Sequence, residues 1–127
     1  MDITQTPYQQ LGGEQTLKQL VARFYELMDT LPEAYEIRQL HPRSLSGSED
    51  KLFMFLSGWL GGPQLYIEAF GHPRLRQRHF PFAIGMQESQ QWMLCMTQAL
   101  EECVEDEALK IFLITQLSKT ANHMINQ

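Results

Sequence analysis

The sequence is poor in cysteine. Its two cysteines, Cys95 and Cys103, lie in what reads as a single helix, where a rise of about 1.5 Å per residue separates them by about 12 Å and excludes a disulfide within that helix. Neither belongs to a CxxC motif, so neither a zinc site nor a dithiol centre is expected, and both are interpreted as small buried apolar residues. Metal binding would therefore have to rely on histidine.

Long apolar runs are also absent. No stretch reaches the roughly 18 apolar residues of a membrane span, and the start, MDITQTPYQQ, has neither the basic region nor the apolar segment of a secretory signal. With 43% hydrophobic and 20% charged residues, the composition is ordinary for a soluble globular protein. The 127 residues suffice for one domain that buries roughly two thirds of its unfolded surface. We expect a single domain over residues 1–127, cytoplasmic and without a membrane partner.

Positive charge is scarce. The 10 Lys and Arg residues are outnumbered by 15 Asp and Glu residues, and the net charge of −5 argues against broad nucleic-acid binding. Three of the basic residues nevertheless lie between Arg74 and Arg78, which predicts a local anionic partner there. A nucleotide-binding loop, an HExxH motif and a serine nucleophile elbow are missing as well, so hydrolytic enzymes are not favoured.

Apolar residues recur at helical spacing through most of the chain, and no segment alternates as a strand would. The expected helices run from the Gly12-Gly13 turn to Pro32, over residues 33–40, from a cap at Ser46 or Ser48 through Leu60, from about Gln87 to Cys103, and from about Asp106 to Asn126. The helix through Leu60 is apolar over most of its circumference, so it should be central. Residues 64–72 read as an irregular connector. These elements predict a small all-α domain.

His79 is the most informative residue of the sequence. It ends a short helical segment that begins after Gly71 and Pro73 and is stopped by Pro81, so its imidazole is expected on a rigid turn. Helical spacing places Leu75 and Arg76 on the same face as His79. Arg74 and Arg78 flank that face. Such a surface suits a flat, apolar ligand with an anionic edge. The alternative is a structural histidine beside solvated arginines.

Two polar aromatic side chains are expected to point inward. Tyr25 falls at the edge of the apolar face of the first long helix and would carry its hydroxyl toward the core. A packed tyrosine bonded to a carbonyl is an equally strong alternative. Trp92 is the largest side chain on the apolar stripe of the helix from Gln87 to Cys103. Together with His79 at a helix end and the arginines beside it, these two donors indicate a haem cavity.

Three stretches, LGGEQTLKQLVARFY, FLSGWLGGPQLYIEAFGHPRLRQRHFPF and QQWMLCM, together resemble the truncated haemoglobins, and among them group II. The resemblance covers nearly the whole chain and is carried by GGP, GHPxLRxRHxPF and the later tryptophan. It implies an all-α, truncated globin-like two-over-two helical sandwich around haem b (iron protoporphyrin IX). It also implies that His79 is the proximal iron ligand, that Trp92 lies over the distal side and that Tyr25 faces the bound gas.

Further cofactor contacts follow from the same resemblance. It implies that a basic residue at Arg78 reaches a haem propionate, whereas helical spacing favours Arg76, so both stay open. The other expected cofactor contacts are apolar or aromatic, namely Leu52, Phe55, Tyr66 and Phe82.

The chain departs from the family pattern in the distal pocket. His41 stands where the family usually has tyrosine or phenylalanine and would add a titratable donor. Many relatives carry glutamine or another residue at Leu52, so the polarity of the pocket should depend more on His41, Tyr25 and Trp92. Ser48 is the candidate gate of the pocket.

The expected function is haem-based binding of O₂, nitric oxide, carbon monoxide or peroxide at a five-coordinate iron, with Tyr25, His41 and Trp92 as the polar groups. Slow O₂ release would favour redox chemistry, nitric oxide oxidation or peroxide handling with an unidentified reductase. It stays open whether the protein is an enzyme. If it is, the expected activity is that of a haem-dependent nitric oxide dioxygenase or a peroxidase-like one. The alternatives are a haem-based gas sensor, an oxygen-transport carrier without turnover, or a cofactor-free interaction module. We expect a monomer or weak homodimer.

Overall fold

The computed structural model describes residues 5–79 and 81–126, and the regular elements in this part of the chain are all helices. In chain order they are α1 (Pro7–Leu11), α2 (Gly13–Thr30), the 3₁₀ turn η1 (Pro32–Ala34), α3 (Tyr35–Gln39), α4 (Ser46–Trp59), α5 (Leu65–Phe70), α6 (Leu75–His79), α7 (Met86–Cys103) and α8 (Glu107–His123). The all-α prediction is confirmed. Among the described residues, no helix is long and apolar enough to cross a membrane.

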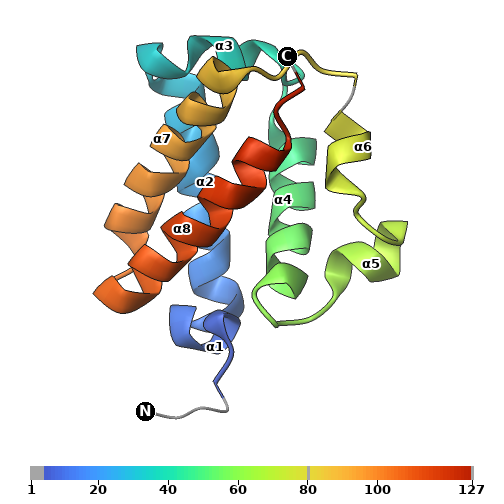
Figure 1. The fold of residues 1–127 in the computed structure, drawn as a ribbon. Coiled ribbons are helices and arrows are strands. Elements are labelled where there is room, and N and C mark those ends of the chain that lie inside the picture. Colours follow the sequence, from blue (N-terminus) through green and yellow to red (C-terminus); the bar gives the residue numbers. More distant parts are fainter. Residues whose placement is uncertain (1–4, 80, 127) are drawn as a thin grey trace.

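Three long helices form most of the core, because α7 packs against α2 on one side and against α8 on the other (Figure 1). Each carries apolar residues three and four positions apart, which places them on one face of the helix. The side chains with almost no exposed surface include Leu17, Phe24 and Met28 of α2, Met96, Ala99 and Leu100 of α7, and Leu113 of α8. Burying each large apolar side chain stabilises the fold by about 1.5–3 kcal/mol.

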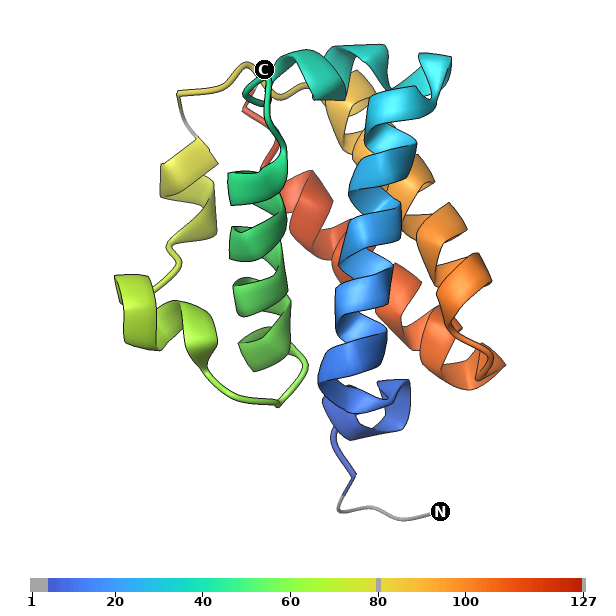
Figure 2. The same cartoon turned by 180° about the vertical axis from the view of Figure 1, so that it is seen from behind.

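Helix α4 lies between this core and the smaller helices α5 and α6, as both views show (Figures 1 and 2). Its apolar surface is broad because it has two neighbours: it packs on α2 at one side and on α5 at the other. Leu56 is buried, whereas Leu52 and Phe55 are half-exposed. The prediction of a central helix is confirmed, and the cap of that helix was predicted wrongly. Ser46 is its first residue, and neither serine caps it from the N-cap position, which Leu45 occupies.

Helix α5 occupies most of the segment that was expected to be irregular. The prediction failed because the helix is only six residues long and none of its residues is buried, so it leaves no apolar stripe in the sequence. Its entry is fixed by Gln64, whose side-chain amide donates to the Gly58 carbonyl at 3.1 Å. Helix α1, which begins at a Thr6–Gln9 capping box, was likewise not expected.

The Gly-Gly-Pro turn after α4 lets the start of the chain pack against that helix. Gly61 has a φ of 91°, in the region that favours glycine. A Cβ on Gly62 would come 2.5 Å from the ring of Tyr8. The Tyr8 amide donates to the Leu60 carbonyl at 2.9 Å, so α1 is bonded to the end of α4. The backbone conformation at Gly61 and the close approach of Tyr8 at Gly62 therefore both require glycine.

Candidate functional site

A cavity of about 500 Å³ lies between α4 and α6 and is closed by parts of α2, α3, α5, α7 and α8. This volume is within the range of about 300–1,000 Å³ typical of small-molecule and cofactor sites. The structure brings all the described predicted side chains to its wall: Tyr25, His41, Ser48, Leu52, Phe55, Tyr66, Arg78, His79, Phe82 and Trp92. The side chain of Arg76 lies outside the described residues, so its contact with a propionate stays a prediction.

His79 is the last residue of α6, and its ring is oriented by the helix that carries it. The ring nitrogen Nδ1 lies 2.6 Å from the carbonyl oxygen of Leu75, one turn earlier. A carbonyl only accepts, so Nδ1 must carry the hydrogen and Nε2 of the neutral ring has a free lone pair. A histidine held in this way is suited to bind a metal through Nε2.

Tyr25 and Trp92 supply polar groups to the cavity from the packed helices α2 and α7. The ring of Phe24 lies 4.8 Å from that of Tyr25 and 5.0 Å from that of Trp92, so both rings are held by the core. Burial, and secondarily the charge of Glu49, raises the pKa of Tyr25, which keeps its hydroxyl protonated.

The donors of Tyr25 and Trp92 are available to a ligand. Neither side chain makes a hydrogen bond within residues 5–79 and 81–126. In the same part of the chain, every side-chain nitrogen or oxygen that is fully buried has a hydrogen-bond partner, so these two polar atoms are not fully buried. The Tyr25 hydroxyl and the Trp92 N–H are therefore not sealed in the core. Since both residues line the cavity, these two donors are open to it.

His41 lies at the end of the cavity formed by α3. Its Nδ1 is 2.9 Å from the Ile37 carbonyl, and its ring is 5.9 Å from that of Tyr25. Burial is the main cause that lowers the pKa of His41 below its usual value; the hydrogen bond to the Ile37 carbonyl opposes this shift, and the charge of Arg38 adds to it. The ring is therefore neutral at neutral pH. Helix α3 is held over the site because the Ile37 amide donates to Gln91 of α7 at 2.9 Å.

Two cationic side chains lie at the cavity beside aromatic rings. The Arg78 guanidinium is 5.7 Å from the centre of the Tyr66 ring, and the Lys51 ammonium is 5.7 Å from the centre of the Phe70 ring. Both residues line the cavity. Sequence reasoning named Arg78 and missed Lys51. Lys51 precedes Phe55 by four positions on α4, so helical spacing contained the signal.

The end of α8 also contributes to the wall, through Leu117, Thr120 and Met124. The sequence predicts a helix over these residues but assigns none of them to the site. A stripe alone does not distinguish a residue packed against another helix from one that faces a cavity.

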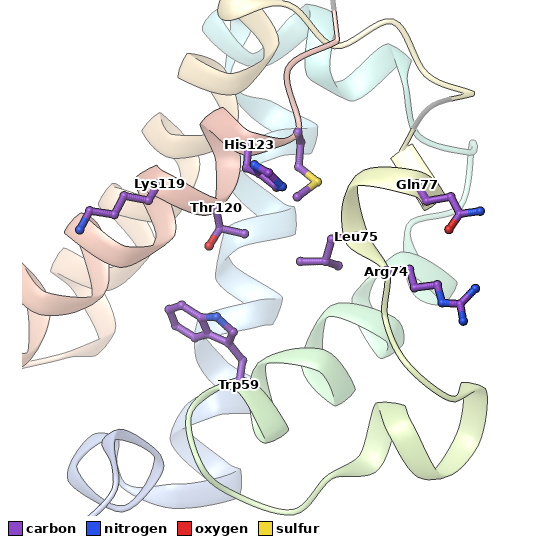
Figure 3. Close-up of a pocket in the computed structure, with 8 residues that line it drawn as sticks. Trp59, Arg74, Leu75, Gln77, Lys119, Thr120 and His123 are labelled. Carbon is purple, nitrogen blue, oxygen red and sulfur yellow. The ribbon is translucent and has the colours of Figure 1, made fainter.

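A second, more open hollow of about 590 Å³ separates α6 from the end of α8 (Figure 3). Trp59, Leu75 and Thr120 point into it, whereas the charged ends of Arg74 and Lys119 point away. Leu75, Thr120 and Met124 line both hollows. Helix α6 is therefore bordered by open space on more than one side.

Comparisons with known proteins agree with this geometry. Residues 6–126 match the family model described as bacterial-like globin. The structure of a group II 2-on-2 haemoglobin from Agrobacterium tumefaciens is 47% identical, with a TM-score of 0.96 over 100% of this chain and 99% of that one. Group 2 truncated haemoglobin YjbI of Bacillus subtilis is 39% identical over 95% of this chain and 89% of its own length. The X-ray structure of a truncated oxygen-avid haemoglobin from Bacillus subtilis, 39% identical, gives a TM-score of 0.88 over 96% of this chain and 100% of that one.

Proposed function

Because the chain belongs to the bacterial-like globin family, and within it to the truncated haemoglobins, we propose that its cavity holds haem b through His79 and serves redox chemistry on small gases. Membership of this family implies haem and the binding of gaseous ligands such as O₂. The proposal adds the residues, the type of haem, the redox role and a cytoplasmic location.

The cavity fits the cofactor in three respects. Its volume of about 500 Å³ is within the cofactor range, and leucine, isoleucine and aromatic side chains make up much of its wall. The Nδ1 bond of His79 leaves Nε2 for a metal. Arg78 and Lys51 offer cations for the two propionates, although Arg76 stays a candidate. Bound in this way, haem supplies an iron with one position open to a diatomic ligand.

Tyr25 and Trp92 would act as hydrogen-bond donors toward that ligand. Their O–H and N–H have no partner among the described residues, and the raised pKa of Tyr25 keeps its proton in place. Hydrogen bonds to a group that carries charge are about twice as strong as neutral ones. Two such donors would slow the release of O₂. Neutral His41 is not a third donor, because its N–H at Nδ1 donates to the Ile37 carbonyl and its Nε2 can only accept. The name oxygen-avid, given to the Bacillus subtilis relative, supports this expectation.

Slow release suits a redox role better than oxygen delivery. Nitric oxide oxidation and peroxide handling both keep the small ligand bound until it reacts, and both need an unidentified reductase to restore the iron. The competing function is a haem-based gas sensor or oxygen carrier without turnover. The observation that carries the proposal is the pair of unpartnered donors, Tyr25 and Trp92, in the same cavity as His79.

The test is the visible spectrum and the turnover of the purified protein. We expect one haem per chain, and consumption of nitric oxide or peroxide when a chemical reductant is supplied. His79→Ala should lose the five-coordinate ferrous spectrum, while His72→Ala, an exposed histidine seven positions earlier, should keep it. Haem binding without turnover of either substrate would favour the sensor or carrier. A wild-type spectrum in His79→Ala would overturn the ligand assignment.

A further inference from the structure

Helix α6 carries His79 and yet has little packing to hold it. It is five residues long, and the extensive helix-to-helix contacts of the described chain do not include it. The cavity of about 500 Å³ and the hollow of about 590 Å³ both border it. The Nδ1 bond fixes the ring relative to α6, but it does not fix α6 relative to the rest of the molecule. Something else must set the position of His79.

The chain beyond α8 reaches that end of α6. In Figure 1 it rises from α8 to the segment that links α6 to α7. The Asn126 amide group donates from Nδ2 to the carbonyl oxygens of His79, at 3.3 Å, and Phe82, at 2.8 Å. Its Oδ1 accepts from the Ile84 amide at 2.9 Å, and its backbone N–H donates to the Ile84 carbonyl at 2.8 Å. One residue thus bonds three positions between 79 and 84.

The chemistry of asparagine matches these partners. A primary amide has two N–H donors and one carbonyl acceptor, and here it meets two carbonyls and one backbone N–H. The last carbonyls of a helix have no partner within that helix. At the end of α6 the His79 carbonyl accepts from the Phe82 amide at 3.0 Å and, in addition, from Asn126 Nδ2. Aspartate could accept from Ile84 but could not donate to His79 or Phe82. Chain ends usually fray unless they are tied down, and Asn126 ties this one.

We propose that Asn126 is a positioning residue for His79, which sets the distance and tilt of the imidazole by anchoring the carboxyl end of α6 to the end of α8. This inference rests on the proposed role of His79 as the haem ligand. It makes the last residues of the chain part of the proximal side of the site. Asn126 itself does not line the cavity.

The test compares Asn126→Ala with Asn122→Ala. Asn122 is the matched control because it lies one turn earlier and bonds Ser89 of α7 at 3.1 Å, without contact to α6 through that bond. In the haem-loaded ferrous protein, Asn126→Ala should shift or broaden the iron–histidine stretching band in the resonance Raman spectrum. It should also release haem to an acceptor protein roughly tenfold faster, the size expected for lost hydrogen bonds. Asn122→Ala should leave the band in place.

Two further variants separate positioning from general stability. Asn126→Gln keeps the amide and should restore part of the wild-type band, while Asn126→Asp keeps only the acceptor and should resemble Asn126→Ala. If Asn126→Ala and Asn122→Ala give the same band and haem-release rates within about twofold, Asn126 only ties the chain end and the inference is wrong.

Amide hydrogen exchange over residues 75–84 tests the anchor without haem. Faster exchange there in Asn126→Ala, and not in Asn122→Ala, is the expected result, and equal exchange would overturn the anchor. A wild-type protein that binds no haem would instead refute the proposed function, while the exchange result would still decide whether Asn126 holds α6.

Discussion

The two sides of the proposed haem cavity are built differently. On one side, α2 and α7 are each 18 residues long and carry side chains with no exposed surface, such as Phe24 and Leu100. On the other side, α5 and α6 have six and five residues, and none of their described side chains is buried. The donors Tyr25 and Trp92 belong to the packed side, and His79 belongs to the loosely packed side. The proposed gas-binding groups are therefore fixed by the fold, whereas the proposed metal ligand is held by few bonds.

Removal of haem should accelerate amide exchange much more on the loosely packed side than on the packed side. A tightly bound ligand stabilises the elements it contacts, on the order of 4 kcal/mol at a thousandfold excess over its dissociation constant. We expect amide exchange in α5 and α6 to accelerate by about a thousandfold without haem, and exchange in the buried turns of α2 and α7 to change far less. Hydrogen exchange of the haem-loaded and haem-free protein measures this. Equal acceleration in all helices would show that the two sides unfold together.

Leucine truncations compare the packing of the two sides directly. Leu100→Ala removes a side chain with 0% exposure and should lower the free energy of unfolding by about 2–5 kcal/mol. Leu65→Ala, on α5, removes a partly exposed side chain and should cost about 1 kcal/mol or less. Urea denaturation of the haem-free variants gives both values. A larger loss for Leu65→Ala would reverse the comparison.

Trp92→Phe tests whether the packed side provides a fixed donor. A hydrogen bond to a charged group contributes about 1.5–3 kcal/mol, so its loss should accelerate O₂ dissociation about tenfold to a hundredfold. Tyr25→Phe should do less, because a hydroxyl can rotate and choose partners. Stopped-flow release from both variants and from the double variant is the measurement, and non-additivity would reveal a shared network. If the O₂ dissociation rate of Trp92→Phe is within about twofold of wild type, the indole only fills space in the core.

The cationic side chains of α4 and α6 test the proposed contacts with the propionates. Lys51→Ala and Arg78→Ala should each speed haem loss by no more than about fivefold, since exposed ion pairs contribute about 1 kcal/mol or less. The spectra of bound gases should hardly change. Arg76→Ala, measured beside them, decides which arginine serves the propionates. If none of the three variants alters haem transfer, these side chains form a solvated face.

His41 should give the smallest effect. Its pKa is lowered in the folded protein, mainly by burial, from the ordinary 6.5. Below about pH 6.5 the unfolded chain therefore binds more protons than the folded chain, and the free energy of unfolding falls as the pH falls. His41→Phe should remove this component. Urea denaturation of both haem-free proteins at several pH values avoids interference from an iron-bound water, and parallel pH profiles would contradict the prediction.

The long helices could be predicted from the sequence because their apolar stripes repeat over several turns. Helices α2, α4 and α7 begin and end close to the expected residues, and the comparisons confirm the two-over-two globin fold. Helix α8 ends at His123, before the expected Asn126. Helix α5 left no signal because none of its residues is buried.

The site could be predicted where one residue carries a distinctive pattern, and less well where several elements combine. His79 stood out through its flanking glycine and prolines, and Trp92 through its size on an apolar stripe. Asn126 gave no signal, because its bonds reach residues that are more than 40 positions away in sequence. Lys51 was missed because a lysine on a helix is usually solvated.

The opposite placement of the chain ends matters for protein engineering. Helix α1 and the carboxyl end lie at opposite ends of the molecule (Figures 1 and 2). An affinity tag or fusion partner joined ahead of α1 would stay remote from α6. The same tag joined after Asn126 would pull on the bonds at His79 and Phe82. Only an amino-terminal tag should therefore preserve the native rates of haem loss and gas release.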